Sequence, residues 1–170
     1  SITTCLGQAP DTLHGWWGFE AALAMHQHVT DRGSPVPARE LRRVAAQCGS
    51  AAEAVRDAAA ARGDRVHQYA EHVALWWSGR GDRAAVDAAR DVLASHGESA
   101  WADHFDDWWA RWQPTPLAVE ATVWNGDVGY AGTIDLVCRI DGRLCFLDWK
   151  TRGSKNGAPK PLNDKVASQL

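Results

Sequence analysis

The stretch Gly129–Thr151, GYAGTIDLVCRIDGRLCFLDWKT, decides the fold of this chain. Within it, two apolar runs at 134–140 and 143–149 flank the dipeptide Asp141-Gly142. This dipeptide favours a two-residue type I′ turn between antiparallel strands. We therefore predict a tight β-hairpin, in which the length of the turn fixes every pair along the ladder.

The register of this hairpin sets two carboxylates opposite each other. If Ile140 faces Arg143, then Asp135 faces Asp148 on a non-hydrogen-bonded pair, where side chains approach to roughly 4.5–5.5 Å. Lys150, two residues further on, shares that face. Like charges opposite each other destabilise a sheet, so this arrangement calls for a cation or a shared proton.

A divalent metal ion is one such cation. Carboxylate oxygens beside an ammonium group suit Mg²⁺ or Mn²⁺, which bind a few carboxylates together with water and substrate phosphate. The alternative is an exposed hairpin with solvated charges. Apolar residues on both faces argue against it and predict strands buried on both sides. They are Val137, Leu144 and Phe146 beside the carboxylates, and Ile134, Leu136, Ile140 and Leu147 opposite.

The order GTID at 132–135, a strand, a turn and DWK at 148–150 resembles the RecB-like branch of the PD-(D/E)XK nuclease superfamily. Phage and CRISPR-associated exonucleases of that branch are the most similar in pattern. Gly63 and His67 match the G-x-x-x-H helix of the family, and Gln169 matches the start of its Q-x-x-x-Y motif. The tyrosine of that motif would lie beyond the given sequence.

This resemblance implies an α/β fold with a restriction-endonuclease-like core, in which a three-stranded antiparallel meander packs on an N-terminal helical region. It implies hydrolysis of DNA phosphodiester bonds, by an exonuclease of phage or prokaryotic recombination, repair or replication. The implied partners are DNA and phage or host recombination proteins. The implied site comprises the Mg²⁺ or Mn²⁺ ligands Asp135, Asp148, His67 and the main-chain carbonyl of Trp149, with Lys150 orienting the attacking water and Gln169 positioning Lys150 or the phosphate.

Two other kinds of function stay open at this point. One is a catalytically inactive nuclease-like module that binds DNA or a partner protein. The other is a tryptophan-rich α+β scaffold without a nucleic-acid role. Metal binding distinguishes the enzyme from the inactive module, and DNA binding at low salt distinguishes both from the scaffold.

A third strand begins near Leu117, where polar and apolar residues start to alternate. Asn125-Gly126 is a second type I′ signal and predicts another two-residue turn. That register sets Glu120 opposite Ala131, four residues and about 13 Å along the strand from the level of Asp135. Glu120 is therefore a secondary candidate, which reaches the site only if a bulge changes the register.

The N-terminal two thirds of the chain predict helices. Apolar periodicity, capping residues and Gly or Pro breaks place them at 11–30, 38–47, 51–62, 64–78, 82–95 and 99–112. In the fourth, Val66, Tyr69, Val73 and Trp77 form the buried stripe. The last contains four of the ten tryptophans, and their helical spacing favours packing over base stacking.

Length and composition predict one soluble domain of 170 residues. We expect a helical part at 1–113, the meander with the site at 116–152, and a basic loop with the start of a helix at 153–170. Such a chain would be a fragment of a longer one. No apolar run is long enough to cross a membrane and no signal peptide is recognisable, so we expect no membrane partner and a cytoplasmic protein, in the host cytoplasm if phage-encoded.

Cysteine and charge patterns add further constraints. The four cysteines show no C-x-x-C spacing, so they predict buried thiols and support no iron–sulfur cluster. The net charge is −3, but residues 139–170 hold seven basic and three acidic side chains, a net +4, leaving −7 elsewhere. This basic segment is either a DNA-facing surface beside the site or a solvated loop. Composition leaves the oligomeric state open.

Overall fold

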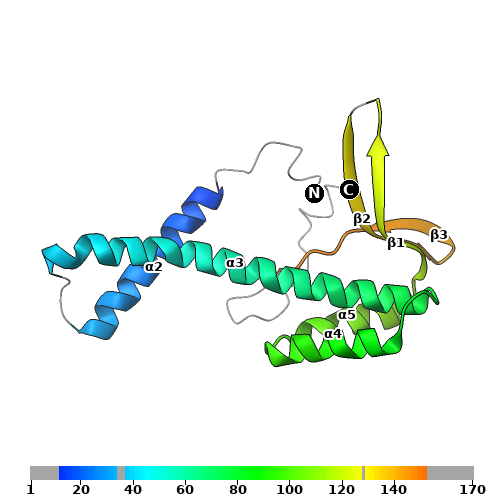
Figure 1. Ribbon diagram of the computed structural model, residues 1–170, viewed down its shortest axis with the longest axis horizontal. Helices are drawn as coiled ribbons and strands as arrows, with labels where there is room; N and C mark the ends of the chain where they lie inside the picture. The colour runs from blue at the N-terminus through cyan, green and yellow to red at the C-terminus, as the bar shows by residue number, and fades with distance from the viewer. Residues whose placement is uncertain (1–11, 34–36, 128, 153–170) are drawn as a thin grey trace. The chain divides into compact units, whose positions relative to one another are not determined.

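The computed structural model describes residues 12–33, 37–127 and 129–152. In these ranges the chain forms four helices and a three-stranded antiparallel sheet (Figure 1). The mixed helix and strand composition predicted from the sequence is thus confirmed, while the restriction-endonuclease-like core stays a prediction. The chain divides into two compact units, residues 1–61 and 62–170. Among the described residues, no helix is both long and apolar enough to span a bilayer.

The first unit contains helix α2, Thr12–Arg32, and the N-terminal part of helix α3, Ala38–Trp77. Arg32 near the end of α2 pairs with Glu40 in the first turn of α3, with 2.8 Å between nitrogen and oxygen. Val44 is fully buried. The first predicted helix is therefore present, with its end shifted by two residues.

Helix α3 is continuous over 40 residues, so the breaks predicted near Gly49 and at Gly63 were wrong. A glycine inside a helix costs only about 1 kcal/mol, and alanine, the best helix former, surrounds both. Ser50, just before the start predicted for the helix at 51–62, does not cap a new helix; its hydroxyl donates to the carbonyl of Gln47 at 2.8 Å. A β-carbon at position 63 would lie 3.4 Å from the Thr151 hydroxyl oxygen, so Gly63 lies close to the segment after the sheet.

The second unit builds its core from the C-terminal part of α3, helices α4 (Arg83–Ser95) and α5 (Ser99–Trp112), and the sheet. Both helices match their predicted ranges, and the Asp82 carboxylate caps α4 by accepting from the Ala84 N–H at 3.0 Å. Trp77, predicted to lie in the buried stripe, is 56% exposed because it is the last residue of α3. The buried core includes Val66, Tyr69, Ala70, Val73, Leu93, Trp101, Phe105, Trp109, Leu136 and Cys138.

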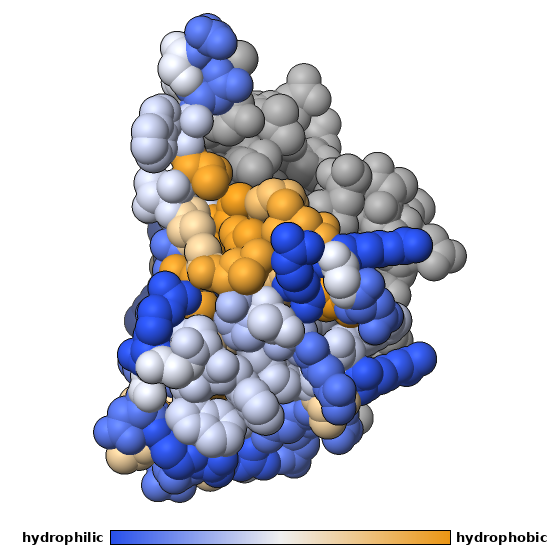
Figure 2. Space-filling model, turned by 90° about the vertical axis from the view of Figure 1, so that its right-hand side faces the viewer, coloured by the Kyte–Doolittle hydropathy of each residue, from blue (hydrophilic) through white to orange (hydrophobic). Residues whose placement is uncertain are grey.

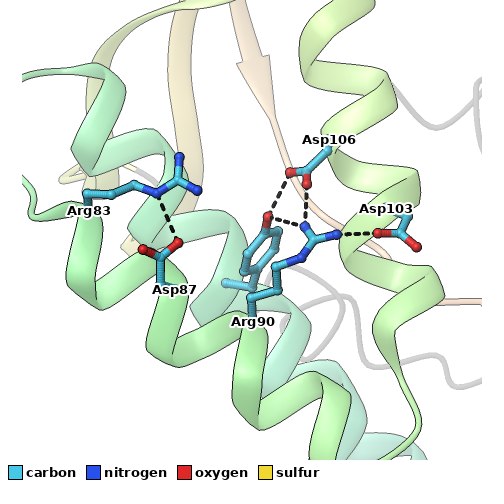
Figure 3. Close-up of polar contacts among 6 residues, drawn as sticks. Arg83, Asp87, Arg90, Asp103 and Asp106 are labelled. Carbon is cyan, nitrogen blue, oxygen red and sulfur yellow. Dashed lines mark hydrogen bonds and ion pairs between the residues drawn. The ribbon is translucent and has the colours of Figure 1, made fainter.

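A polar network joins the three helices of this unit (Figure 3). Arg90 of α4 pairs with Asp103 and, at 2.5 Å, with Asp106 of α5. The Tyr69 hydroxyl of α3 donates to Asp106 at 2.7 Å and accepts from Arg90 at 3.1 Å. Burial and the hydrogen bond to Asp106 raise the pKa of Tyr69 to about 12. The network therefore keeps this phenol neutral and fixes the helices that lie under the sheet.

The sheet follows the predicted meander, in the order β1, β2, β3. Its strands are Thr115–Asn125, Tyr130–Ile140 and Arg143–Leu147. The hairpin register is confirmed, since Ile140 pairs with Arg143 and the ladder continues in step to Leu136 and Leu147. Asp141 and Gly142 have φ values of 49° and 77°, the two positive values that a type I′ turn requires.

The connection between β1 and β2 is longer than predicted. Trp124 pairs with Ala131 instead of Asp127, so the two-residue turn at Asn125-Gly126 was wrong. The Asn125 side-chain oxygen accepts from the Asp127 N–H at 3.0 Å, and the Asn125 carbonyl accepts from the Gly129 N–H at 2.9 Å. Asparagine thus starts an Asx turn inside a wider loop, which closes at Gly129 with φ 74°. The register of β1 against β2 shifts by four residues as a consequence.

The two faces of the hairpin differ. Leu136 and Cys138 are fully buried on the face toward the helical core, whereas Leu144 and Phe146 on the other face are 52% and 57% exposed. The prediction of burial on both faces was therefore wrong for β3, because α3, α4 and α5 supply a core on one side. Asp135 and Val137 of β2, on the same face as Leu144 and Phe146, are buried and half-buried. Figure 2 shows a hydrophobic patch on the surface that lies on the right in Figure 1.

Candidate active site

Asp135 lies in β2 with its side chain turned into the protein and only 8% of its surface exposed. A buried carboxylate is costly unless it accepts hydrogen bonds. Its Oδ2 accepts the Trp149 backbone N–H at 2.5 Å. His67 of α3 approaches the same oxygen, with its Nδ1 3.6 Å away, slightly beyond hydrogen-bond distance. The fold thus brings together a strand acid and a helix histidine that are 68 residues apart in the sequence.

The contact with Trp149 also explains where β3 ends. In a continued ladder, Trp149 would be the hydrogen-bonded partner of Ile134. Its N–H is instead held by the Asp135 carboxylate, and β3 ends at Leu147. The predicted pair of Asp135 with Asp148 lies one step beyond the last ladder pair.

Asp148 and Lys150 follow this end of β3 and pair with each other. Lys150 Nζ lies 2.5 Å from Asp148 Oδ2, and both side chains are about half exposed, at 52% and 51%. The DWK motif therefore presents an ion pair to solvent. Between the two charged residues of this pair, the Trp149 backbone N–H donates to Asp135. An ammonium group next to a carboxylate at the surface is free to exchange this partner for a phosphate.

The shifted register of β1 changes the position of Glu120. Val119 pairs with Leu136 and Ala121 pairs with Ile134, so Glu120 lies level with Asp135 on the neighbouring strand. Sequence reasoning placed it about 13 Å away, opposite Ala131, and that placement was wrong. The physical reason is the wider loop after Asn125. Glu120 has φ 50°, a left-handed backbone conformation that is uncommon for a residue with a side chain and tends to persist at functional sites.

The charges around Glu120 interact. Burial and the negative charges of Asp135 and Glu71 raise the pKa of Glu120, whereas His67 lowers it. Glu71 lies one helical turn after His67 on α3 and was not singled out from the sequence. The available signal was the H-x-x-x-E spacing, which places both side chains on one face of a helix. Glu120 therefore feels the charges of acids on β2 and α3 and of His67, and His67 lies 3.6 Å from Asp135.

Aromatic packing positions the segment that carries the DWK motif. The Trp149 ring meets Phe105 and Trp108 of α5 edge to face, with centroid distances of 5.1 and 5.3 Å. Edge-to-face contacts of this kind are favourable beyond the buried area. They hold the backbone of Trp149 where its N–H reaches Asp135. The main-chain carbonyl of Trp149 was the predicted metal ligand, but the contact with Asp135 is made by its N–H.

The candidate residues are only partly gathered into one group. His67 lies beside Asp135 and Glu120 is level with Asp135 on the neighbouring strand, whereas Asp148 has Lys150 as its partner. Within the ranges that the structure describes, no three His, Cys, Asp or Glu side chains are arranged to hold a metal ion. Gln169 lies outside the described residues.

Comparison of this chain with known protein families, with curated proteins and with solved structures gave no match. The RecB-like resemblance therefore rests on the motifs quoted above and stays a prediction.

Proposed function

We propose that this protein is a metal-dependent deoxyribonuclease that hydrolyses DNA phosphodiester bonds, acting as an exonuclease. The observation that carries the proposal is the pairing of a buried acid with a solvent-facing lysine motif. Asp135 is held by the backbone of the residue between Asp148 and Lys150. Hydrolysis of a phosphodiester needs acids that bind a metal ion and a cation that contacts the substrate phosphate.

The donor set suits Mg²⁺ or Mn²⁺. Burial and then the negative charges of Asp135 and Glu71 raise the pKa of Glu120, and a dication bound beside these carboxylates would favour its charged form. Magnesium in proteins uses one or two carboxylates and completes its shell with water and phosphate oxygens, so a third protein ligand is not required. Asp135, Glu120 and Asp148 are the carboxylates that would hold it, with His67 as a further ligand. A bound ion would supply an activated water and would neutralise charge on the phosphate.

The other groups of the chain have separate roles in this proposal. Lys150 exchanges its contact with Asp148 for the scissile phosphate or the attacking water, which it orients. Orientation is the suitable role because an ordinary lysine, with a pKa of about 10.4, stays protonated at neutral pH. Gln169 would help to position Lys150. Trp149 keeps Asp135 in place through its N–H.

The test is degradation of linear DNA by the purified chain in Mg²⁺ or Mn²⁺. Lys150→Ala and Asp148→Ala should abolish it, with unchanged circular dichroism because both side chains are half exposed. The matched controls are Arg143→Ala, which removes an exposed cation at the start of β3, and Asp127→Ala, which removes an exposed anion in the loop between β1 and β2. Full activity in either DWK variant would reject the site.

A second candidate is an inactive nuclease-like module that binds DNA or a protein. The close pair between Lys150 and Asp148 favours it, because each group neutralises the other without a metal. Calorimetry distinguishes the two: binding of Mn²⁺ in the millimolar range or tighter, lost in Asp135→Asn, supports the enzyme. Salt-sensitive DNA binding without Mn²⁺ binding supports the module. The nuclease proposal includes a role in phage or prokaryotic recombination, repair or replication. Its partners would be recombination proteins in the host cytoplasm.

A further inference from the structure

The second unit exposes tryptophan at the end where α3 and α5 both stop and α4 begins (Figure 1). Trp77, the last residue of α3, is 56% exposed, and Trp112, the last residue of α5, is 44% exposed. Tryptophan is mostly buried in folded proteins, and exposed aromatic side chains that lie together mark interaction surfaces.

A buried ring packs against Trp77, and a guanidinium group lies against Trp112. Trp77 stacks on the buried ring of Trp109, with 6.5 Å between centroids and 26° between planes. Trp112 lies one helical turn after Trp109 on α5, and the Arg111 guanidinium lies 5.4 Å from the centroid of its ring. A ligand that stacks on Trp77 therefore meets a ring that packing has already ordered, which lowers the entropic cost of binding.

Unpaired cations accompany the exposed rings. Arg80, in the loop after α3, donates to the Ser78 hydroxyl at 3.1 Å, and Arg111 lies over Trp112. Among the described residues, neither arginine forms an ion pair with a carboxylate. Arg83 is different, because it pairs with Asp87 at 2.9 Å and so contributes little net charge.

Exposed indole rings next to unpaired guanidinium groups match the chemistry of a single nucleic-acid strand. Bases stack on aromatic faces whatever their sequence, and arginine neutralises the phosphates between them. Duplex DNA fits less well because its bases are already stacked on each other. Charge complementarity together with stacking therefore favours a single strand over a protein partner, which would not need the arginines.

This surface connects to the candidate active site through aromatic contacts. The Trp149 ring contacts Trp108, Trp108 contacts Trp109 at 6.2 Å, and Trp109 contacts Trp77 at 6.5 Å. We propose that the surface formed by Trp77, Arg80, Arg111 and Trp112 binds single-stranded DNA and holds the strand on which the DWK motif acts. The identity of the substrate strand rests on the proposed nuclease function, whereas the binding itself does not.

The test measures binding of a fluorescein-labelled oligothymidylate by anisotropy, in EDTA so that no hydrolysis occurs. Trp77→Ala and Trp112→Ala should each weaken binding about 5- to 150-fold, as expected for loss of one stacked base. Replacing both Arg80 and Arg111 by Gln should lower the slope of log K against log salt by about 1.4. Trp124→Ala is the matched control, because Trp124 is 77% exposed but lies near the far end of β1.

Several outcomes would overturn the proposal. One is unchanged oligonucleotide affinity in both tryptophan variants, and another is a loss of affinity in Trp124→Ala as large as in those variants. The others are an unchanged salt slope in the double arginine variant, or a loss of affinity for duplex DNA in the tryptophan variants as large as the loss for the single strand. Thermal unfolding of each variant identifies a general loss of structure. If the tryptophan variants are unfolded, the salt slope of the double arginine variant decides whether this surface binds DNA, since that variant removes no packed ring.

The outcome for binding is separable from the outcome for catalysis. If wild-type protein binds the strand through this surface but degrades no DNA with Mg²⁺ or Mn²⁺, the binding proposal holds and the nuclease proposal fails. If it degrades DNA, and Trp77→Ala and Trp112→Ala bind and degrade as wild type does, the nuclease proposal holds and the binding surface is rejected. Lys150→Ala should lose hydrolysis while keeping oligonucleotide affinity within about threefold, since stacking and the two arginines supply most of the binding.

Discussion

Asp135 should be a structural residue as well as a candidate catalytic one, and its two neutral replacements separate these roles. Asp135→Ala removes the acceptor for the Trp149 N–H, a hydrogen bond of 2.5 Å to a buried carboxylate. Hydrogen bonds to charged groups contribute about 1.5–3 kcal/mol. Relief of the repulsion with Glu120 offsets part of that loss, so we expect Asp135→Ala to lower the free energy of unfolding by about 2 kcal/mol. Asp135→Asn keeps an oxygen acceptor and also removes the repulsion, so its stability should lie within about 1 kcal/mol of wild type.

Urea unfolding at pH 7, followed by tryptophan fluorescence and circular dichroism, measures these differences. With a slope of about 2 kcal/mol per molar urea, the alanine variant should unfold about 1 M earlier than wild type. Asp148→Ala is the control, because its half-exposed pair with Lys150 should contribute at most about 1 kcal/mol. All three variants should lack Mg²⁺-dependent hydrolysis, so activity and stability are expected to vary independently.

The reasoning about Asp135 fails if the alanine variant is as stable as the asparagine variant. It also fails if Asp148→Ala unfolds as early as Asp135→Ala, because the buried hydrogen bond would then have no special contribution.

Three further predictions concern the rest of the second unit. Because the pKa of Glu120 is raised in the folded state, wild type loses stability as pH rises from below 4.5 through the folded-state pKa. Glu120→Gln should therefore be stabilising at pH 7 but not at pH 4, as measured by urea unfolding at both values. Tyr69→Phe should cost about 1–2 kcal/mol through lost hydrogen bonds in the network of Figure 3, and it should remove the decline in stability that wild type shows from pH 10 through about 12 in alkaline unfolding. Gly81→Ala should lower the thermal midpoint by the equivalent of about 1–3 kcal/mol, because its β-carbon would lie 2.7 Å from the Trp76 backbone nitrogen; Gly126→Ala, with no atom within 4 Å, should change stability by less than about 0.5 kcal/mol.

Turn-forming and helix-capping residues in the sequence determined those strands and helices whose ends they mark. Asp141-Gly142 supplies the two positive φ values of a type I′ turn, so the register of β2 against β3 could be predicted residue by residue. The ranges of helices α4 and α5 were also predictable from local signals, since Asp82 caps the start of α4 and Pro114 follows the end of α5. Local turn chemistry misled at Asn125, whose side chain forms an Asx turn in a wider loop.

Tertiary packing decided the rest. Gly49 and Gly63 looked like helix ends, yet α3 passes through both, since the helix gains more from continuity and from packing against the core than two glycines cost. The candidate site followed the same division. The sequence by itself placed Asp135, Asp148 and Lys150 on the hairpin, because strand period and turn length fix their positions. Only the fold set Glu120 level with Asp135, turned the Trp149 N–H onto the Asp135 carboxylate and brought His67 to 3.6 Å from it. Contacts between distant segments depend on packing that no local pattern encodes.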